Sequence, residues 1–236
     1  MTLAKLGFLA VFATMVAHAP QGANNLDVAN RVASYAESQI SPAISLPVQS
    51  KNPGLLGVGK ILVASRGLGD PSFAQTVILL VQYDAGGVVG LILNRRTELP
   101  VSRVLGDYQA AKDRSDPVYL GGPVDSQQIL ALRKSPTKLD GATQICDGVY
   151  QIVTKAQLEQ TLTDRATPKA FRVYLGYAGW HADQLRKEME LGGWFVFPGD
   201  AQTVFNSDPD FLWPQMIRKT ELQMARNEPV DTNRWP

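Results

Sequence analysis

The sequence has little of what disulfide-bonded, zinc-binding and nucleic-acid-binding proteins depend on. One cysteine, Cys146, and two histidines, His18 and His181, are too few for an intramolecular disulfide or an ordinary zinc site. The 23 lysines and arginines nearly balance the 22 aspartates and glutamates, which argues against a broad electrostatic contact with DNA or anionic lipid. We therefore predict no metal or other cofactor and no direct nucleic-acid binding, and we expect the partner to be a protein or a small ligand.

What is present is typical of a globular protein. The chain has 236 residues, of which 44% are hydrophobic and 19% charged, enough for one sizeable core or two small ones. No internal repeat or low-complexity tract interrupts it.

The N-terminal 23 residues have the pattern of a secretory signal peptide. One positive charge, Lys5, precedes the apolar run Leu6–Ala17 and the small-residue sequence Ala17-His18-Ala19. The run is shorter than the roughly 20 apolar residues that span a bilayer. We expect a periplasmic or secreted protein that does not span the membrane once the leader is removed. If the segment is instead a local helix or follows a wrong start codon, the protein is cytoplasmic.

The rest of the chain divides into three parts. Residues 24–54 predict a short helix and a linker broken by Pro42, Pro47 and Pro53. Residues 55–220 form the expected folded domain, and residues 221–236 are a polar tail.

Strand and helix patterns intermix without regular alternation, which predicts an α/β fold of the α+β type. A capping-box pattern, Thr154 with Gln157, opens one helix. Asp84–Gly87 and Asp147-Gly148 are typical of hairpin turns. We expect strands in segments 59–65, 75–83, 88–96, 117–120, 128–133, 142–153, 171–175 and 194–200, and helices in 154–164, 181–192 and 208–220.

Few side chains form a recognisable chemical motif. Arg66–Pro71 is rich in glycine but lacks the third glycine of a dinucleotide-binding loop and the lysine of a P-loop, so we expect a turn and helix cap at Asp70. His181 begins a predicted helix, and no nucleophile-elbow pattern accompanies it, which favours a surface histidine. Cys146 lies in a predicted strand and is expected to be an unreactive core residue.

Two further groups can bind a ligand or be structural. Arg95 and Arg96 end a predicted buried strand and can hold a carboxylate or phosphate, or pair with acidic side chains. Tyr177, Trp180 and Trp194 bracket a predicted turn in GYAGW; such aromatic groups are usually core and sometimes line a pocket.

Several motifs occur in a specific order. They are Ser65, Leu68, DPSF at 70–73, LILNR at 91–95, GGPV at 121–124, GYAGW at 176–180 and QL at 184–185. In this order and spacing they resemble the AlgH/YqgE family of bacteria, over residues 55 to 215. The resemblance implies a single compact domain with a bifurcated β-sheet, a small barrel-like portion and surrounding helices.

The sequence also departs from the family pattern. Arg66 and Arg96 stand where a proline is usual, Arg133 where a histidine is common, and Asp183 where a glycine precedes Gln184. Family members are often labelled transcriptional regulators, but this sequence has no helix-turn-helix pattern or basic face.

These observations favour a non-catalytic binding or regulatory module that acts through its motif loops, in the cell envelope. The alternatives are a cytoplasmic transcriptional regulator and an enzyme that uses Asp70 with Arg95 or His181. The candidate binding residues are Asp70, Asn94, Arg95, Gly121, Gly122, Tyr177 and Trp180.

Overall fold

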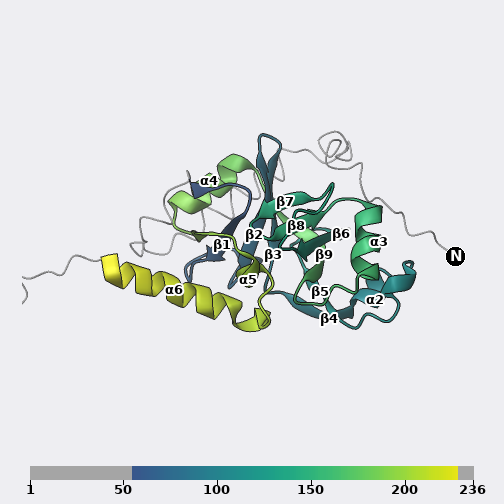
Figure 1. The fold of residues 1–236 in the computed structure, drawn as a ribbon. Coiled ribbons are helices and arrows are strands. Elements are labelled where there is room, and N and C mark those ends of the chain that lie inside the picture. The colour runs from purple at the N-terminus through teal and green to yellow at the C-terminus, as the bar shows by residue number, and fades with distance from the viewer. Residues whose placement is uncertain (1–54, 228–236) are drawn as a thin grey trace, which may run out of the picture.

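The computed structural model describes residues 55–227 (Figure 1). The predicted leader (1–23) and the helix and linker of 24–54 lie outside the described residues, as does the end of the predicted tail. The strands are β1 (Lys60–Ala64), β2 (Val77–Asp84), β3 (Gly87–Ile92), β4 (Arg96–Pro100), β5 (Pro117–Leu120), β6 (Val124–Lys134), β7 (Thr143–Cys146), β8 (Val149–Ile152), β9 (Phe171–Trp180) and β10 (Trp194–Pro198). The helices are α2 (Val101–Val104), η3 (Gln109–Ala111), α3 (Lys155–Thr163), α4 (Ala182–Glu190), α5 (Ala201–Val204), η4 (Pro209–Phe211) and α6 (Leu212–Asn227).

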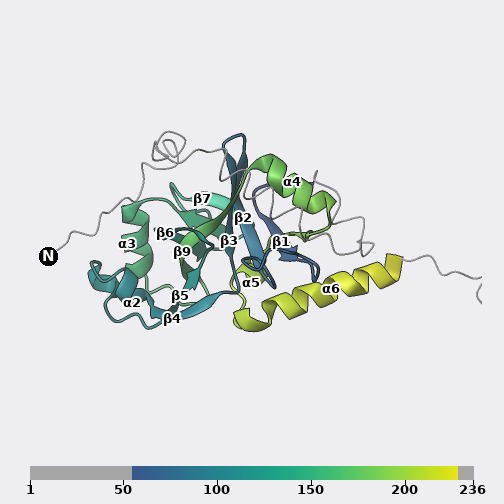
Figure 2. The same ribbon diagram turned by 180° about the vertical axis from the view of Figure 1, so that it is seen from behind.

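The strands form one mixed sheet of ten strands in the order β10-β1-β2-β3-β9-β6-β8-β7, with β4 and β5 off this path. All pairs are antiparallel except β5 with β9, which is parallel. The α+β class, the two hairpins and the capping box at Thr154 are confirmed. Helices α4 and α6 lie at one end of the molecule and α2 and α3 at the other, as the two opposite views show (Figures 1 and 2).

The sheet divides at β9, which is the predicted bifurcation. On one side the last residues of β9, Ala178–Trp180, pair with β3, whereas Tyr174 and Leu175 pair with β5. Gly176 lies between the two stretches with a φ of 66°. The sequence GYAGW is therefore part of a bent strand, and the predicted turn there is wrong.

The two outermost strands in this order, β10 and β7, approach each other, so the sheet curls into a half-barrel. The Gly199 N–H donates to the Gly59 carbonyl at 2.8 Å. A Cβ on Gly59 would lie 2.3 Å from the Ile145 carbonyl oxygen of β7, and one on Gly199 3.3 Å from Cys146 Sγ. Only residues without a side chain allow β7 to pack this closely against the start of β1 and the end of β10.

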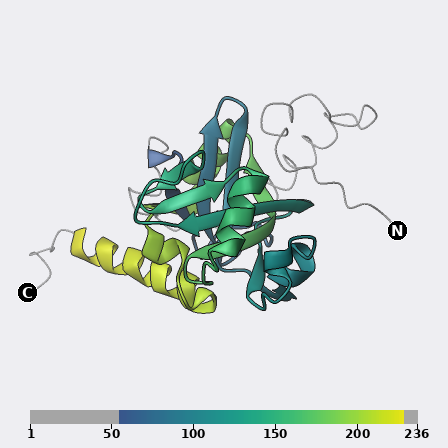
Figure 3. The ribbon, with the colours of Figure 1, turned by 45° about the vertical axis from the view of Figure 1, so that its right-hand side comes forward.

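Two apolar clusters hold the fold together. The larger cluster packs β1, β2, β3 and β10 against α4 and the first turns of α6, and Ile61–Ala64 of β1 are fully buried within it. The smaller cluster lies between the sheet and the helices α2 and α3. The view in Figure 3 shows α6 extending past the sheet and the β2–β3 hairpin rising from it.

Some predicted boundaries are wrong. Strand β4 carries no sequence signal, because its residues are largely exposed and show no alternating apolar pattern. The last helix was expected at 208–220, but α6 begins at Leu212 after a 3₁₀ turn and continues to Asn227, beyond the predicted start of the tail.

Candidate functional site

The loop from Ser65 to Thr76 joins β1 to β2 and carries the DPSF motif; we call it the motif loop. The Asp70 carboxylate accepts the Ser72 N–H at 2.7 Å, and the Asp70 carbonyl accepts the Phe73 N–H at 3.0 Å. The Thr76 hydroxyl donates to the Phe73 carbonyl at 2.7 Å. The loop is thus a series of turns. Asp70 caps a turn as expected, but no helix follows it.

Asn94 and Arg95, in the turn between β3 and β4, fasten the motif loop to the sheet. The Asn94 side chain accepts the Val77 N–H and donates to the Gln75 carbonyl, both at 2.9 Å. Arg95 Nη2 donates to the Ser72 carbonyl at 2.5 Å. Partial burial lowers the pKa of Arg95 and the neighbouring Asp70 carboxylate opposes that shift. Asp70 and the adjacent pair Asn94 and Arg95, which come from separate segments, therefore meet at one loop.

An aromatic group anchors the centre of the loop. The buried Phe73 ring stacks on Trp180 with centroids 5.2 Å apart and meets Trp194 edge-on at 5.9 Å. Trp180 and Trp194 are themselves perpendicular at 6.1 Å. Trp180, from the end of β9, is buried in the core rather than lining an open pocket. Its contact with Phe73 places it in the same site as Asp70, Asn94 and Arg95.

Glu188, on α4, contacts this aromatic group and was not among the residues predicted from the sequence. Its carboxylate accepts the Trp194 indole N–H at 2.8 Å and the Gln184 amide at 3.0 Å. The Trp180 indole N–H also favours the ionised carboxylate but makes no hydrogen bond of ordinary geometry. Burial raises the pKa of Glu188, these N–H groups oppose the rise, and the negative charge of Asp70 adds to it. The i, i+4 spacing of Gln184 and Glu188, four residues after the GYAGW motif, was a usable signal.

Gly121, Gly122 and Tyr177 lie elsewhere, at the branch of the sheet. A Cβ on Gly121 would be 2.1 Å from the Gly176 carbonyl oxygen, and one on Gly122 2.1 Å from the Tyr177 carbonyl carbon. Real Cβ atoms do not approach the backbone this closely, so close packing alone explains why glycine occupies both positions. Burial raises the pKa of Tyr177, and Asp125 adds to that rise. The seven candidate residues thus fall into two groups, four at the motif loop and three at the branch.

The remaining chemically versatile side chains lie outside the motif loop. His181 is the exposed N-cap residue of α4 and makes no capping hydrogen bond through its side chain, consistent with the expected surface histidine. Burial, with Asp200 and Asp147 nearby, raises the pKa of Cys146 to about 11, so its thiol is protonated at neutral pH. Residues 55–227 contain no group of three or more histidine, cysteine, aspartate or glutamate side chains that could hold a metal ion.

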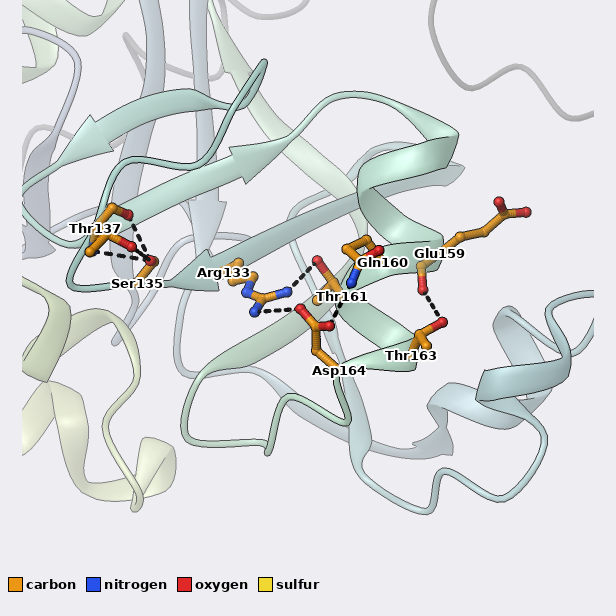
Figure 4. Close-up of polar contacts among 8 residues, drawn as sticks. All are labelled: Arg133, Ser135, Thr137, Glu159, Gln160, Thr161, Thr163 and Asp164. Carbon is orange, nitrogen blue, oxygen red and sulfur yellow. Dashed lines mark hydrogen bonds and ion pairs between the residues drawn. The ribbon is translucent and has the colours of Figure 1, made fainter.

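Each of the four departures from the family pattern makes an ion pair. Arg66 pairs with Glu221 at 3.0 Å, Arg96 with Asp210 at 2.8 Å and Asp183 with Arg186 at 3.3 Å. In Figure 4 Arg133 reaches from β6 to α3, where it contacts Thr161 and Asp164, both at 3.0 Å. The Arg133 and Gln160 hydrogen bonds lower the pKa of the exposed Asp164. These side chains are therefore occupied by partners within this chain.

In the part of the chain that the structure describes, no helix has both the length and the apolar character needed to cross a membrane.

Comparison with known proteins identifies the family. A family model described as AlgH-like matches residues 61–225. A UPF0301 protein of Chlorobium limicola is 32% identical over 174 residues, which is 72% of this chain and 91% of the relative. A UPF0301 protein of Streptomyces avermitilis is 32% identical over 179 residues, covering 73% and 92%.

Solved structures show the same fold. The solution structure of the AlgH protein from Pseudomonas aeruginosa has a TM-score of 0.56 at 24% identity, covering 80% of this chain and all of that one. The crystal structure of a Corynebacterium diphtheriae protein has a TM-score of 0.59 at 22% identity, covering 75% and 89%. The matched family model, the curated relatives and the shared fold agree: this chain belongs to the AlgH-like family.

Proposed function

We propose that this protein is a non-catalytic binding module with a regulatory role, and that it acts through the motif loop. One observation carries the proposal: the turn after β3, the end of β9 and the start of β10 together hold a loop whose outer surface is exposed. Asn94, Arg95 and the aromatic group around Phe73 fix the loop from beneath. Asp70, Pro71 and Ser72 remain exposed.

A fixed, exposed loop is favourable for recognition because its ordering cost is met during folding rather than at binding. The loop presents both signs of charge. Asp70 is exposed, and the guanidinium group of the half-buried Arg95 donates to the Ser72 carbonyl through Nη2, which leaves further guanidinium donors for a partner. We infer a partner with complementary polar groups, either a protein or a small ligand. Given the predicted leader, we place this interaction in the cell envelope.

Asp70→Asn gives the sharpest test. Asparagine keeps the oxygen that accepts the Ser72 N–H, so the turn is retained while the charge is lost. We expect the variant to keep its thermal midpoint and to fail to complement a deletion of the gene in the source bacterium. Arg103→Gln, at an exposed position on α2, is the control and should complement fully. Full complementation by Asp70→Asn and by Arg95→Gln would refute the proposal.

An enzymatic role is the second candidate function, and the raised pKa of Glu188 favours it. A carboxyl group with a raised pKa beside an exposed loop can act as a proton donor. Glu188→Gln separates the two functions, because a binding module that recognises Asp70 tolerates the change if the fold is kept. Loss of function in folded Glu188→Gln with full function in Asp70→Asn would favour the enzyme.

A further inference from the structure

Arg172, on β9, is a buried cation without a carboxylate partner. Its side chain is only 4% exposed, although it lies in a strand that is otherwise apolar apart from its tyrosines. Nη1 donates to the Leu93 carbonyl at 3.4 Å and Nη2 to the Asn206 carbonyl. None of the ion pairs among the described residues includes it. Buried charges are ordinarily paired, so this guanidinium needs an explanation.

Two hydrogen-bond donors in this region also lack an acceptor, although the Arg172 side chain lies near enough to the Tyr174 oxygen to favour the ionised phenol. Arg172 Nε and the Tyr174 hydroxyl are both buried and make no hydrogen bond of ordinary geometry. Burial raises the pKa of Tyr174 to about 12, so the hydroxyl keeps its proton and can donate. The guanidinium carbon lies 4.6 Å from the Tyr119 ring centroid and 5.9 Å from that of Phe205. These rings attract a cation but supply no counter-charge.

Two carboxylates near Tyr119 are already paired with other arginines. Asp210 and Asp116 both influence Tyr119 electrostatically, which places them near the same cluster. Asp210 pairs with Arg96 at 2.8 Å, and Asp116 pairs with Arg114 at 2.7 Å. Neither carboxylate pairs with Arg172, so its charge has no opposite charge among the ion pairs of the described residues.

We propose that Arg172 and Tyr174 form a binding site for a small oxyanion, such as phosphate or a carboxylate. A water molecule would accept from both unpaired donors but would leave the charge uncompensated. An oxyanion would accept from both donors and would also balance the charge. Arg96 also acts on Tyr119, but Asp210 offsets its charge, so the uncompensated charge is that of Arg172. The site does not depend on the proposed function of the motif loop.

The test measures the thermal midpoint while sodium phosphate or sodium acetate is titrated at constant ionic strength, made up with sodium chloride. At a hundredfold excess over its Kd, a ligand that binds only the folded state raises the midpoint of a chain of this size by roughly 5–10 °C. The variant is Arg172→Met. The matched control is Arg133→Met on the neighbouring strand, which removes an arginine that is already paired with Asp164.

We expect a saturable rise in the native protein and in Arg133→Met, and none in Arg172→Met. The anion that produces the rise distinguishes a phosphoryl ligand from a carboxylate. An equal rise in all three proteins, or no rise in the native protein, would overturn the proposal.

If Arg172→Met does not fold, the native protein alone decides the question. The Arg172 Nε–H resonance is followed by proton–nitrogen NMR, because its burial slows exchange with water. A saturable shift with phosphate or acetate supports the site, and an unchanged resonance overturns it.

Discussion

Asn94 tests whether the motif loop is held by the hydrogen bonds described above. Its amide accepts the Val77 N–H and donates to the Gln75 carbonyl, so Asn94→Ala removes both partners at once. Val77 is fully buried, and leaving its N–H unsatisfied costs about 1–3 kcal/mol. Gln75 is exposed, so its carbonyl can turn to water, and the lost bond costs only about 0.5–1.5 kcal/mol. The expected loss of stability is roughly 2–4 kcal/mol.

The assay is urea unfolding followed by tryptophan fluorescence, with calorimetry as a second measurement. A loss of this size lowers the thermal midpoint by roughly 4–16 °C for a chain of this length. Asp84→Ala is the control, because the Asp84 carboxylate also accepts two hydrogen bonds, but in an exposed turn: the Gly86 N–H at 2.7 Å and the Gln82 amide at 3.0 Å. Its loss should cost about 0.5–1.5 kcal/mol. If Asn94→Ala costs no more than Asp84→Ala, the burial argument is wrong.

Three further predictions concern other parts of the fold. Because the pKa of Glu188 is raised, its contribution to stability is fully present below the unfolded-state pKa of glutamate, about 4.3, and is lost as pH rises through the folded-state pKa. The free energy of unfolding of Glu188→Gln, measured by chemical unfolding from pH 4 to 8, should lack this decline. Parallel pH profiles for the native protein and the variant would contradict the prediction. Gly122→Ala places a Cβ 2.1 Å from backbone and should cost roughly 3 kcal/mol or more, whereas Gly67→Ala, with no atom within 4 Å, should be nearly silent in the same unfolding assay; similar midpoints for both would refute the close approach. Thr154→Ala removes the capping box of α3 and should cost about 0.5–2 kcal/mol by calorimetry, with Thr154→Ser close to native; an unchanged midpoint would show that tertiary contacts alone hold this helix.

Local patterns predicted much of the fold correctly. Continuous apolar runs indicated β1, β2 and β3 because these strands are buried on both faces, and Asp147-Gly148 indicated a turn because glycine adopts its positive φ of 67° without strain. Where burial is set by a distant segment, the same patterns failed. GYAGW was expected to be a turn because it holds two glycines, yet these glycines serve the branch of the sheet within β9.

The candidate site divides in the same way. The motif residues Asp70, Asn94, Arg95 and Trp180 were identified from the sequence, and the structure gathers them at one loop. Glu188 was missed: its i, i+4 spacing with Gln184 was visible, but nothing local indicates that the indole N–H of Trp194 reaches its carboxylate.

The sequence by itself determined the hairpins and the capped helix, because each depends on neighbours within a few residues. The order of motifs and of strand and helix patterns along the chain determined the family and the class of fold. Only the tertiary structure decided which polar groups lose contact with water. Arg172 illustrates the reason: its environment is set by Leu93, Tyr119 and Asn206, from three other segments of the chain. Desolvation depends on the packing of all these segments together, and no local pattern in the sequence encodes it.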